Sequence, residues 1–186
     1  SQHRISGYQG GQKRAFVVNP TAFDLVVGKW GARYRGQVFP CAVGRGGIGQ
    51  KQGEGDGITP KGRWQITGAG YRADRLVRPD FAFPNHRIGP TDIWSDDAAD
   101  PAYNHHVAVR AHPFSHEKLR RTDPLYDIYA ILDFNWPNSV PGAGSAIFLH
   151  AWRKPRHPTE GCVAFAPNVL RYILESWETR SRVVIR

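Results

Sequence analysis

The chain has 186 residues, 40% of them hydrophobic and 12% aromatic, and a formal net charge of +9. This length and content suit one domain with a substantial core, and no apolar run approaches the roughly 18 residues that cross a membrane. Twenty glycines and 14 prolines favour short strands and tight turns over a helical bundle, and two cysteines are too few for a disulfide scaffold.

The excess of basic residues predicts attraction to polyanions at low salt. The arginines are scattered and form no long basic helix or known binding module, so we expect no nucleic-acid partner. The negatively charged bacterial envelope is the other candidate. The first residues lack the apolar core of a signal peptide, so an exported protein would already have lost its signal.

The chain begins with a polar, basic and Gly-rich segment. Residues 1–13 are predicted to be a flexible lead-in, and residues 14–186 a single folded domain. Strands are predicted at residues 14–18 and 23–27, joined by an Asn-Pro-Thr turn, and at residues 34–43.

The segment GRGGIG at residues 44–49 matches the dinucleotide-binding pattern G-x-G-x-x-G. A helix must follow that pattern to direct its N-terminus at the pyrophosphate, but residues 50–62 are rich in glycine and include a proline. We therefore expect a loop, and no nucleotide or other cofactor. Residues 59–66 predict a turn into a strand with Trp64 and Ile66 on one face.

The middle of the chain raises the question of a metal site. Residues 92–104 are acidic and rich in turn formers, but their carboxylates do not follow a calcium-loop pattern. Four histidines invite a zinc interpretation: His105, His106, His112 and His116. Pro113 interrupts the second pair and no H-E-x-x-H order occurs, so we expect no metal. Ser115 instead predicts the N-cap of a helix.

Residues 125–133 predict a strand, Pro167 the first turn of a helix with one apolar face, and residues 183–185 a final strand. Between them, residues 145–149 form an apolar run that predicts a buried strand, with His150 at its end. A basic, proline-broken loop then leads to Cys162, and this loop can return the cysteine to the histidine.

A cysteine beside a histidine has a well-defined chemistry. The thiolate is the nucleophile, and His150 can act as the base that forms it. The backbone carbonyl of Ala151 can fix the tautomer of the imidazole, and the amides of Gly161 and Cys162 can face the oxyanion of a tetrahedral intermediate. Such a site suits acyl transfer through a thioester. Buried cysteines are commonly plain core residues, however, so the spacing alone leaves catalysis and structure both open.

The stretch with His150 and the sequence TEGC at residues 159–162 resembles the signature of the L,D-transpeptidase family, the YkuD-type catalytic domain. In that family a histidine on a strand precedes a loop ending in Ser/Thr-x-Gly-Cys. The sequence TPKGRW at residues 59–64 is similar to the family's Thr-Pro-x-Gly-aromatic segment, and GAGSAI at residues 142–147 extends the resemblance over roughly residues 14–166.

Two departures from the family pattern concern the substrate. The loop before Cys162 is short, and Ala164 stands where members usually have an arginine, which resembles a compact subgroup without accessory wall-binding domains. Another side chain would then hold the substrate carboxylate. The substrate-binding candidates are Arg153, Arg156, Thr159, Tyr103 and Asn104.

The resemblance implies a mainly β fold, a β-sandwich of mixed sheets with a few short helices. It also implies a periplasmic enzyme without a cofactor, acting on peptidoglycan stem peptides that contain meso-diaminopimelate. The sequence leaves the oligomeric state open, and we favour a monomer. Cys162 would form the acyl-enzyme and an amine of a second stem would resolve it, with 1-3 links slightly favoured over 3-3 links. The alternatives are hydrolysis, as an L,D-carboxypeptidase or endopeptidase, and a non-catalytic module that binds polyanions or the envelope.

Overall fold

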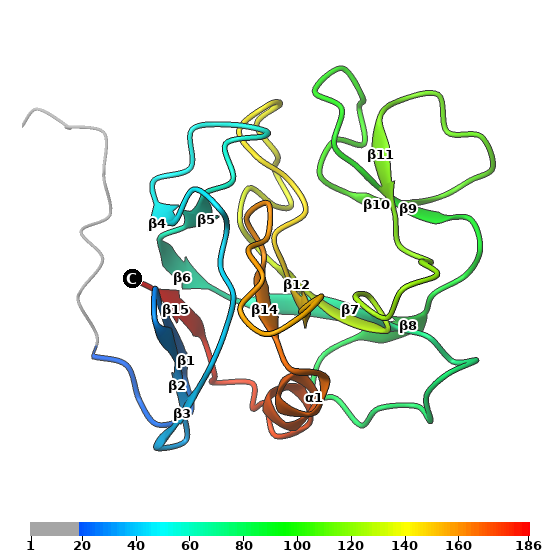
Figure 1. Ribbon diagram of the computed structural model, residues 1–186. Helices are drawn as coiled ribbons and strands as arrows, with labels where there is room; N and C mark the ends of the chain where they lie inside the picture. Colours follow the sequence, from blue (N-terminus) through cyan, green and yellow to red (C-terminus); the bar gives the residue numbers. More distant parts are fainter. Residues whose placement is uncertain (1–18) are drawn as a thin grey trace, which may run out of the picture.

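The computed structural model describes residues 19–186 (Figure 1). The predicted lead-in and the predicted strand at residues 14–18 lie outside the described residues. The first of two five-stranded sheets has the order β3 (Gln37–Phe39), β2 (Gly31–Tyr34), β1 (Leu25–Gly28), β15 (Val183–Ile185) and β6 (Gly62–Trp64). β15 is parallel to β1 and antiparallel to β6, so the sheet is mixed.

The prediction of one long strand at residues 34–43 is wrong, because the chain turns back after Tyr34. Arg35 and Gly36 have φ angles of 48° and 75°. Two consecutive positive φ angles give the tight turn that joins antiparallel strands. Tyr34 therefore pairs with Gln37, and the segment forms the hairpin of β2 and β3.

The second five-stranded sheet has the order β14 (Val163–Phe165), β13 (Phe148–Ala151), β12 (Ile128–Leu132), β7 (Ile66–Tyr71) and β8 (Asn85–Arg87). The run from β6 to β7 passes from the first sheet to the second. The break falls at Gln65, whose amide donates to Asp133 Oδ1 at 2.8 Å. Trp64 and Ile66 therefore belong to different sheets, and their predicted place on one strand face is wrong.

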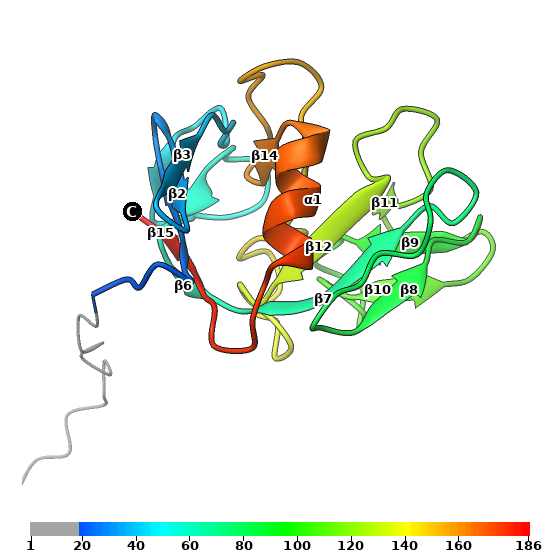
Figure 2. The same ribbon diagram turned by 90° about the horizontal axis from the view of Figure 1, so that it is seen from below.

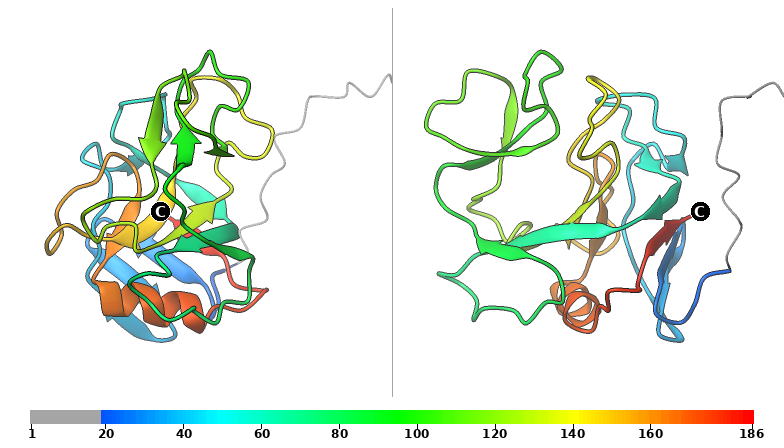
Figure 3. Two further views of the ribbon diagram at one scale, coloured as in Figure 1. Left: turned by 90° about the vertical axis from the view of Figure 1, so that its right-hand side faces the viewer. Right: turned by 180° about the vertical axis from the view of Figure 1, so that it is seen from behind.

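Two smaller sheets complete the fold. Strands β10 (His106–Ala108), β9 (Asp92–Ser95) and β11 (His116–Lys118) form a three-stranded sheet, here called the lobe, and β4 (Ile48–Gly49) pairs with β5 (Thr59–Pro60). The lobe stands beyond β8, away from the first sheet (Figure 3). The helix predicted after Ser115 is wrong, because His116–Lys118 pairs with β9 and the backbone bonds along that ladder instead.

The predicted helix at Pro167 is confirmed as α1 (Pro167–Glu175), with proline in its first turn. Leu170, Ile173 and Leu174 are its buried residues, and the helix packs against β13 and β14 (Figure 2). Its apolar face joins one core with side chains from both five-stranded sheets. This close-packed core fixes the positions of β13 and β14.

The predicted fold class is confirmed: the protein is mainly β with mixed sheets. Within residues 19–186 it has one α-helix rather than a few. No helix in this part of the chain is long and apolar enough to cross a membrane.

Candidate active site

The parallel pair of β13 and β14 brings His150 and Cys162 to one face of the sheet. Leu149 pairs with Val163, so Cys162, the residue before β14, lies beside Phe148. Alternate residues of a strand share a face, which places His150 on the side where Cys162 lies. His150 lies within the strand rather than at its end, and its side chain and that of Cys162 both line a cavity of about 510 Å³.

The thiol of Cys162 is held by the backbone around it. Its Sγ lies 3.1 Å from the carbonyl oxygen of Ala146, to which it donates, and accepts from the amide of Phe148 at 3.3 Å. Burial, and secondly the nearby carboxylate of Glu117, raise the pKa of Cys162 to about 12. The thiol is therefore protonated in the free protein.

His150 is buried and has a partner for one ring nitrogen. Its Nδ1 lies 2.7 Å from the carbonyl oxygen of Ala151. Because a carbonyl only accepts, Nδ1 carries the hydrogen and Nε2 keeps its lone pair. Burial lowers the pKa of His150 to about 4, although the hydrogen bond to Ala151 opposes this shift. At neutral pH the free protein therefore holds an imidazole and a thiol, rather than an ion pair.

Lys51 and Gly161 line the cavity, and Gly144 packs against the Lys51 side chain. Gly144 and Gly161 have φ angles of 128° and 146°, and a Cβ on Gly144 would lie 2.6 Å from Cε of Lys51. The Lys51 side chain, 3% exposed, is tied by its ammonium to Asp56 at 2.7 Å and to the carbonyl of Ile58 at 3.1 Å. The glycines thus leave room for a buried cation beneath the loop that carries Cys162.

The turn before Cys162 is closed by Thr159. Its hydroxyl donates to the carbonyl of Cys162 at 2.6 Å and accepts from the amide of Gly161 at 3.1 Å. The Gly161 amide is therefore engaged within the turn.

The structure places Tyr103 and Asn104 behind the cavity, where both are buried. The Tyr103 hydroxyl donates to Glu54 at 2.5 Å and accepts from the amide of Gly144 at 2.9 Å. Asn104 Oδ1 accepts from the amide of Ala146 at 3.0 Å. Both side chains therefore hold the segment that presents the Ala146 carbonyl to the thiol, and neither is among the residues that line the cavity.

The two candidate arginines lie in different places. Arg153 is exposed, lines the cavity, and has no ion-pair partner in the described part of the chain. Arg156 lies elsewhere on the surface, where its Nη1 donates to the carbonyl of Trp30 at 3.3 Å. Arg153 is thus the one of the two that can meet a carboxylate in the cavity.

The opposite wall carries residues that sequence reasoning missed. Glu117, in β11, accepts a hydrogen bond from the hydroxyl of Tyr126, and the Tyr126 ring packs edge-on to His150 at a centroid distance of 5.3 Å. Burial raises the pKa of Glu117, against the effect of the Tyr126 hydroxyl and of Arg121. No local signal marks these residues, because Glu117 comes from the lobe and Tyr126 from the segment before β12, both well upstream of His150.

A neutral thiol, a neutral imidazole and a carbonyl that fixes its tautomer are the parts of a cysteine acyl-transfer site. The chain belongs to the YkuD family, the L,D-transpeptidase catalytic domain, whose family model matches residues 13–185.

A curated relative is the tRNA 5-methylaminomethyl-2-thiouridine biosynthesis bifunctional protein MnmC of Burkholderia ambifaria, 31% identical over 119 residues. The match covers 56% of this chain and 18% of that protein, so the chain spans less than a fifth of the relative's length. No solved structure matches the chain.

Proposed function

We propose that this protein is a peptidoglycan L,D-transpeptidase of the bacterial periplasm that works through a Cys162 thioester. The observation that carries the proposal is the shared cavity of Cys162 and His150, with Nδ1 of His150 held by the Ala151 carbonyl. Membership of the family supports peptidoglycan as the substrate.

In the first step the Cys162 sulfur attacks the carbonyl of an L-residue in a donor stem peptide. The thiol proton leaves its hydrogen bond to Ala146 and passes to Nε2 of His150, and a C–S bond forms. Collapse of the tetrahedral intermediate breaks the peptide C–N bond, and His150 gives the proton to the leaving amine. The Cys162 amide is the oxyanion donor we favour, because the Gly161 amide is engaged with Thr159.

In the second step an amine of a neighbouring stem, from meso-diaminopimelate, attacks the thioester. His150 accepts its proton and returns it to the departing thiolate, which restores the neutral pair. The cavity suits both partners, because Arg153 can pair with a stem carboxylate while Glu54, Asp96 and Glu117 offer acceptors to an incoming ammonium or amine.

The choice of donor residue in the stem peptide rests on the sequence around Cys162 and not on the shape of the cavity. The short loop and the sequence TEGC at residues 159–162 slightly favour 1-3 links, from L-Ala to meso-diaminopimelate, over 3-3 links. Water in place of the amine would give an L,D-carboxypeptidase or endopeptidase.

The test is incubation with isolated muropeptides and mass analysis of the products, which separates the two links and hydrolysis. Cys162→Ala should form neither acyl-enzyme nor cross-links. Cys41→Ala is the matched control, since it removes the other buried cysteine, which lies outside the cavity. Cross-linking by the Cys162 variant would refute the catalytic proposal, and retained sacculus binding without any turnover by the wild type would favour a binding module.

A further inference from the structure

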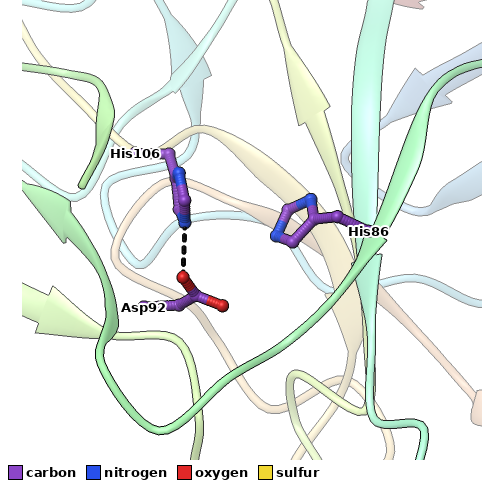
Figure 4. A group of neighbouring side chains, drawn as sticks. All are labelled: His86, Asp92 and His106. Carbon is purple, nitrogen blue, oxygen red and sulfur yellow. Dashed lines mark hydrogen bonds and ion pairs between the residues drawn. The ribbon is translucent and has the colours of Figure 1, made fainter. Parts of the chain in front are cut away.

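A second polar cluster lies outside the cavity, where the lobe meets β8. His86 in β8, Asp92 at the start of β9 and His106 at the start of β10 each offer one ligand atom, and these atoms lie within 4.8 Å of one another. Figure 4 shows the three side chains turned toward a common point from three separate strands. Two imidazoles and a carboxylate are a donor set that divalent transition metals favour.

The carboxylate of Asp92 is fixed and lacks a strong cation. Its Oδ2 accepts from the amide of Gly89 at 2.5 Å, and its Oδ1 lies 2.8 Å from Nε2 of His106. The Asp92 side chain is 11% exposed, and its ion-pair partner within residues 19–186 is this histidine rather than a lysine or arginine. A buried carboxylate is costly without a compensating positive charge, which a divalent ion would supply.

The His86 ring contacts Tyr129 through the same nitrogen that faces Asp92 and His106 (Figure 4). Its Nε2 lies 3.2 Å from the hydroxyl of Tyr129. Gly70 makes room for that phenol, since a Cβ there would lie 2.4 Å from Cε1 of Tyr129.

We propose that His86, Asp92 and His106 bind a divalent transition-metal ion, best matched by Zn²⁺ with water as its fourth ligand. Bonds of about 2.0–2.1 Å to zinc require ligand atoms roughly 3.4 Å apart, so the cluster must contract slightly. The His106 side chain is 36% exposed, so its ring can move toward the other two ligands. On binding, its Nε2 loses its proton and coordinates the metal instead.

The ion would join two parts of the fold. His86 belongs to the second five-stranded sheet, and Asp92 and His106 belong to the lobe. The metal would therefore clamp the lobe, which carries Glu117 into the cavity wall, to the main body. This inference goes beyond the acyl-transfer chemistry and does not depend on it. It also departs from the sequence expectation of no metal, which weighed His106 only against neighbouring histidines.

The test uses the full chain without an affinity tag, carrying Cys162→Ala so that the cavity thiol cannot capture zinc. Chelator-stripped protein is titrated with Zn²⁺ in competition with a chromophoric chelator, and its melting temperature is recorded with and without the ion. We expect one equivalent of zinc to bind and to raise the melting temperature. His106→Ala should weaken binding by more than about tenfold and abolish the thermal shift.

His105→Ala is the matched control, because it removes the adjacent imidazole and should leave affinity and thermal shift unchanged. Asp92→Asn provides a second variant of nearly equal shape, and should behave like His106→Ala. Absence of stoichiometric binding, or equal melting temperatures in zinc and in chelator, would mean that the cluster is only hydrogen-bonded. Binding that survives both ligand variants would place the ion elsewhere, and either result overturns the proposal.

Discussion

Replacing Asn104 with alanine tests whether this side chain supports the site or binds the substrate. Its Oδ1 accepts from Nε1 of Trp94 and the amide of Ala146, both at 3.0 Å, and its Nδ2 donates to the carbonyls of Phe134 at 3.2 Å and Asn135 at 2.6 Å. Four buried hydrogen bonds at about 1 kcal/mol each, plus about 1 kcal/mol for alanine at a φ of 57°, give a loss of about 5 kcal/mol. Water entering the space would reduce this to about 3 kcal/mol.

The assay is urea unfolding, with the loss taken from the midpoint at constant slope. Asn104→Asp is a second variant: it keeps the oxygen acceptor and tolerates the positive φ, but it sets a buried carboxylate oxygen against the carbonyls of Phe134 and Asn135, so its loss should be at least as large. Cross-linking by Asn104→Ala should fall at saturating substrate, because the Ala146 carbonyl that accepts from the thiol loses its anchor. A loss of stability below about 1 kcal/mol with a raised KM would refute this reasoning and restore a substrate-binding role.

Three further predictions concern the cavity and its floor. Burial raises the pKa of Cys162 to about 12. In a variant that lacks the second cysteine, the rate of Cys162 alkylation by iodoacetamide should therefore still rise about tenfold per pH unit from pH 8 to 10. A rate that levels off below pH 9 would contradict the burial argument. Gly36→Ala should lower the free energy of unfolding by about 1 kcal/mol, because the φ of Gly36 is 75° but no atom lies near its Cβ position. Gly161→Ala should lower it by more in the same unfolding assay, because the added Cβ would lie 3.0 Å from a backbone oxygen. Burial acts to raise the pKa of Asp56, but hydrogen bonds from Lys51 and from backbone amides outweigh it and hold this pKa below its ordinary value of 3.8. The Asp56 carboxylate therefore stabilises the fold above pH 3.8, and this contribution is lost as the pH falls further. Asp56→Asn should therefore melt lower than the wild type at pH 7, with a gap that narrows below about pH 4; a gap independent of pH would exclude the charge as its cause.

The sequence was informative where local chemistry decides the structure. Pro167 and the apolar face after it predicted the helix correctly, and the strand at residues 183–185 was predicted with its observed bounds. The apolar run before His150 predicted a strand, but the strand begins later, at Phe148. The positive φ of Ala146, 54°, bends the chain just before it, and nothing in an alanine announces such a bend.

Long-range pairing decided the parts that were missed. The segment after Ser115 has the residues of a helix start, but pairing with β9 makes it a strand and turns Glu117 toward the cavity. Lys51, in a Gly-rich segment that was predicted to be a loop, lies under Cys162 because two distant glycines admit it. Such residues become neighbours through topology, which periodicity and spacing do not encode.

The place of β15 in the first sheet has a consequence for how the molecule is assembled. This strand lies between β1 and β6, although about 155 residues separate it from β1 along the chain. During synthesis β1 can pair early with β2, but β6 has no partner in this sheet until Val183–Ile185 arrives between it and β1. Closing so large a loop is entropically slow. We therefore expect a nascent chain stalled before these residues to stay protease-sensitive, and the sheet to be completed only after they are released.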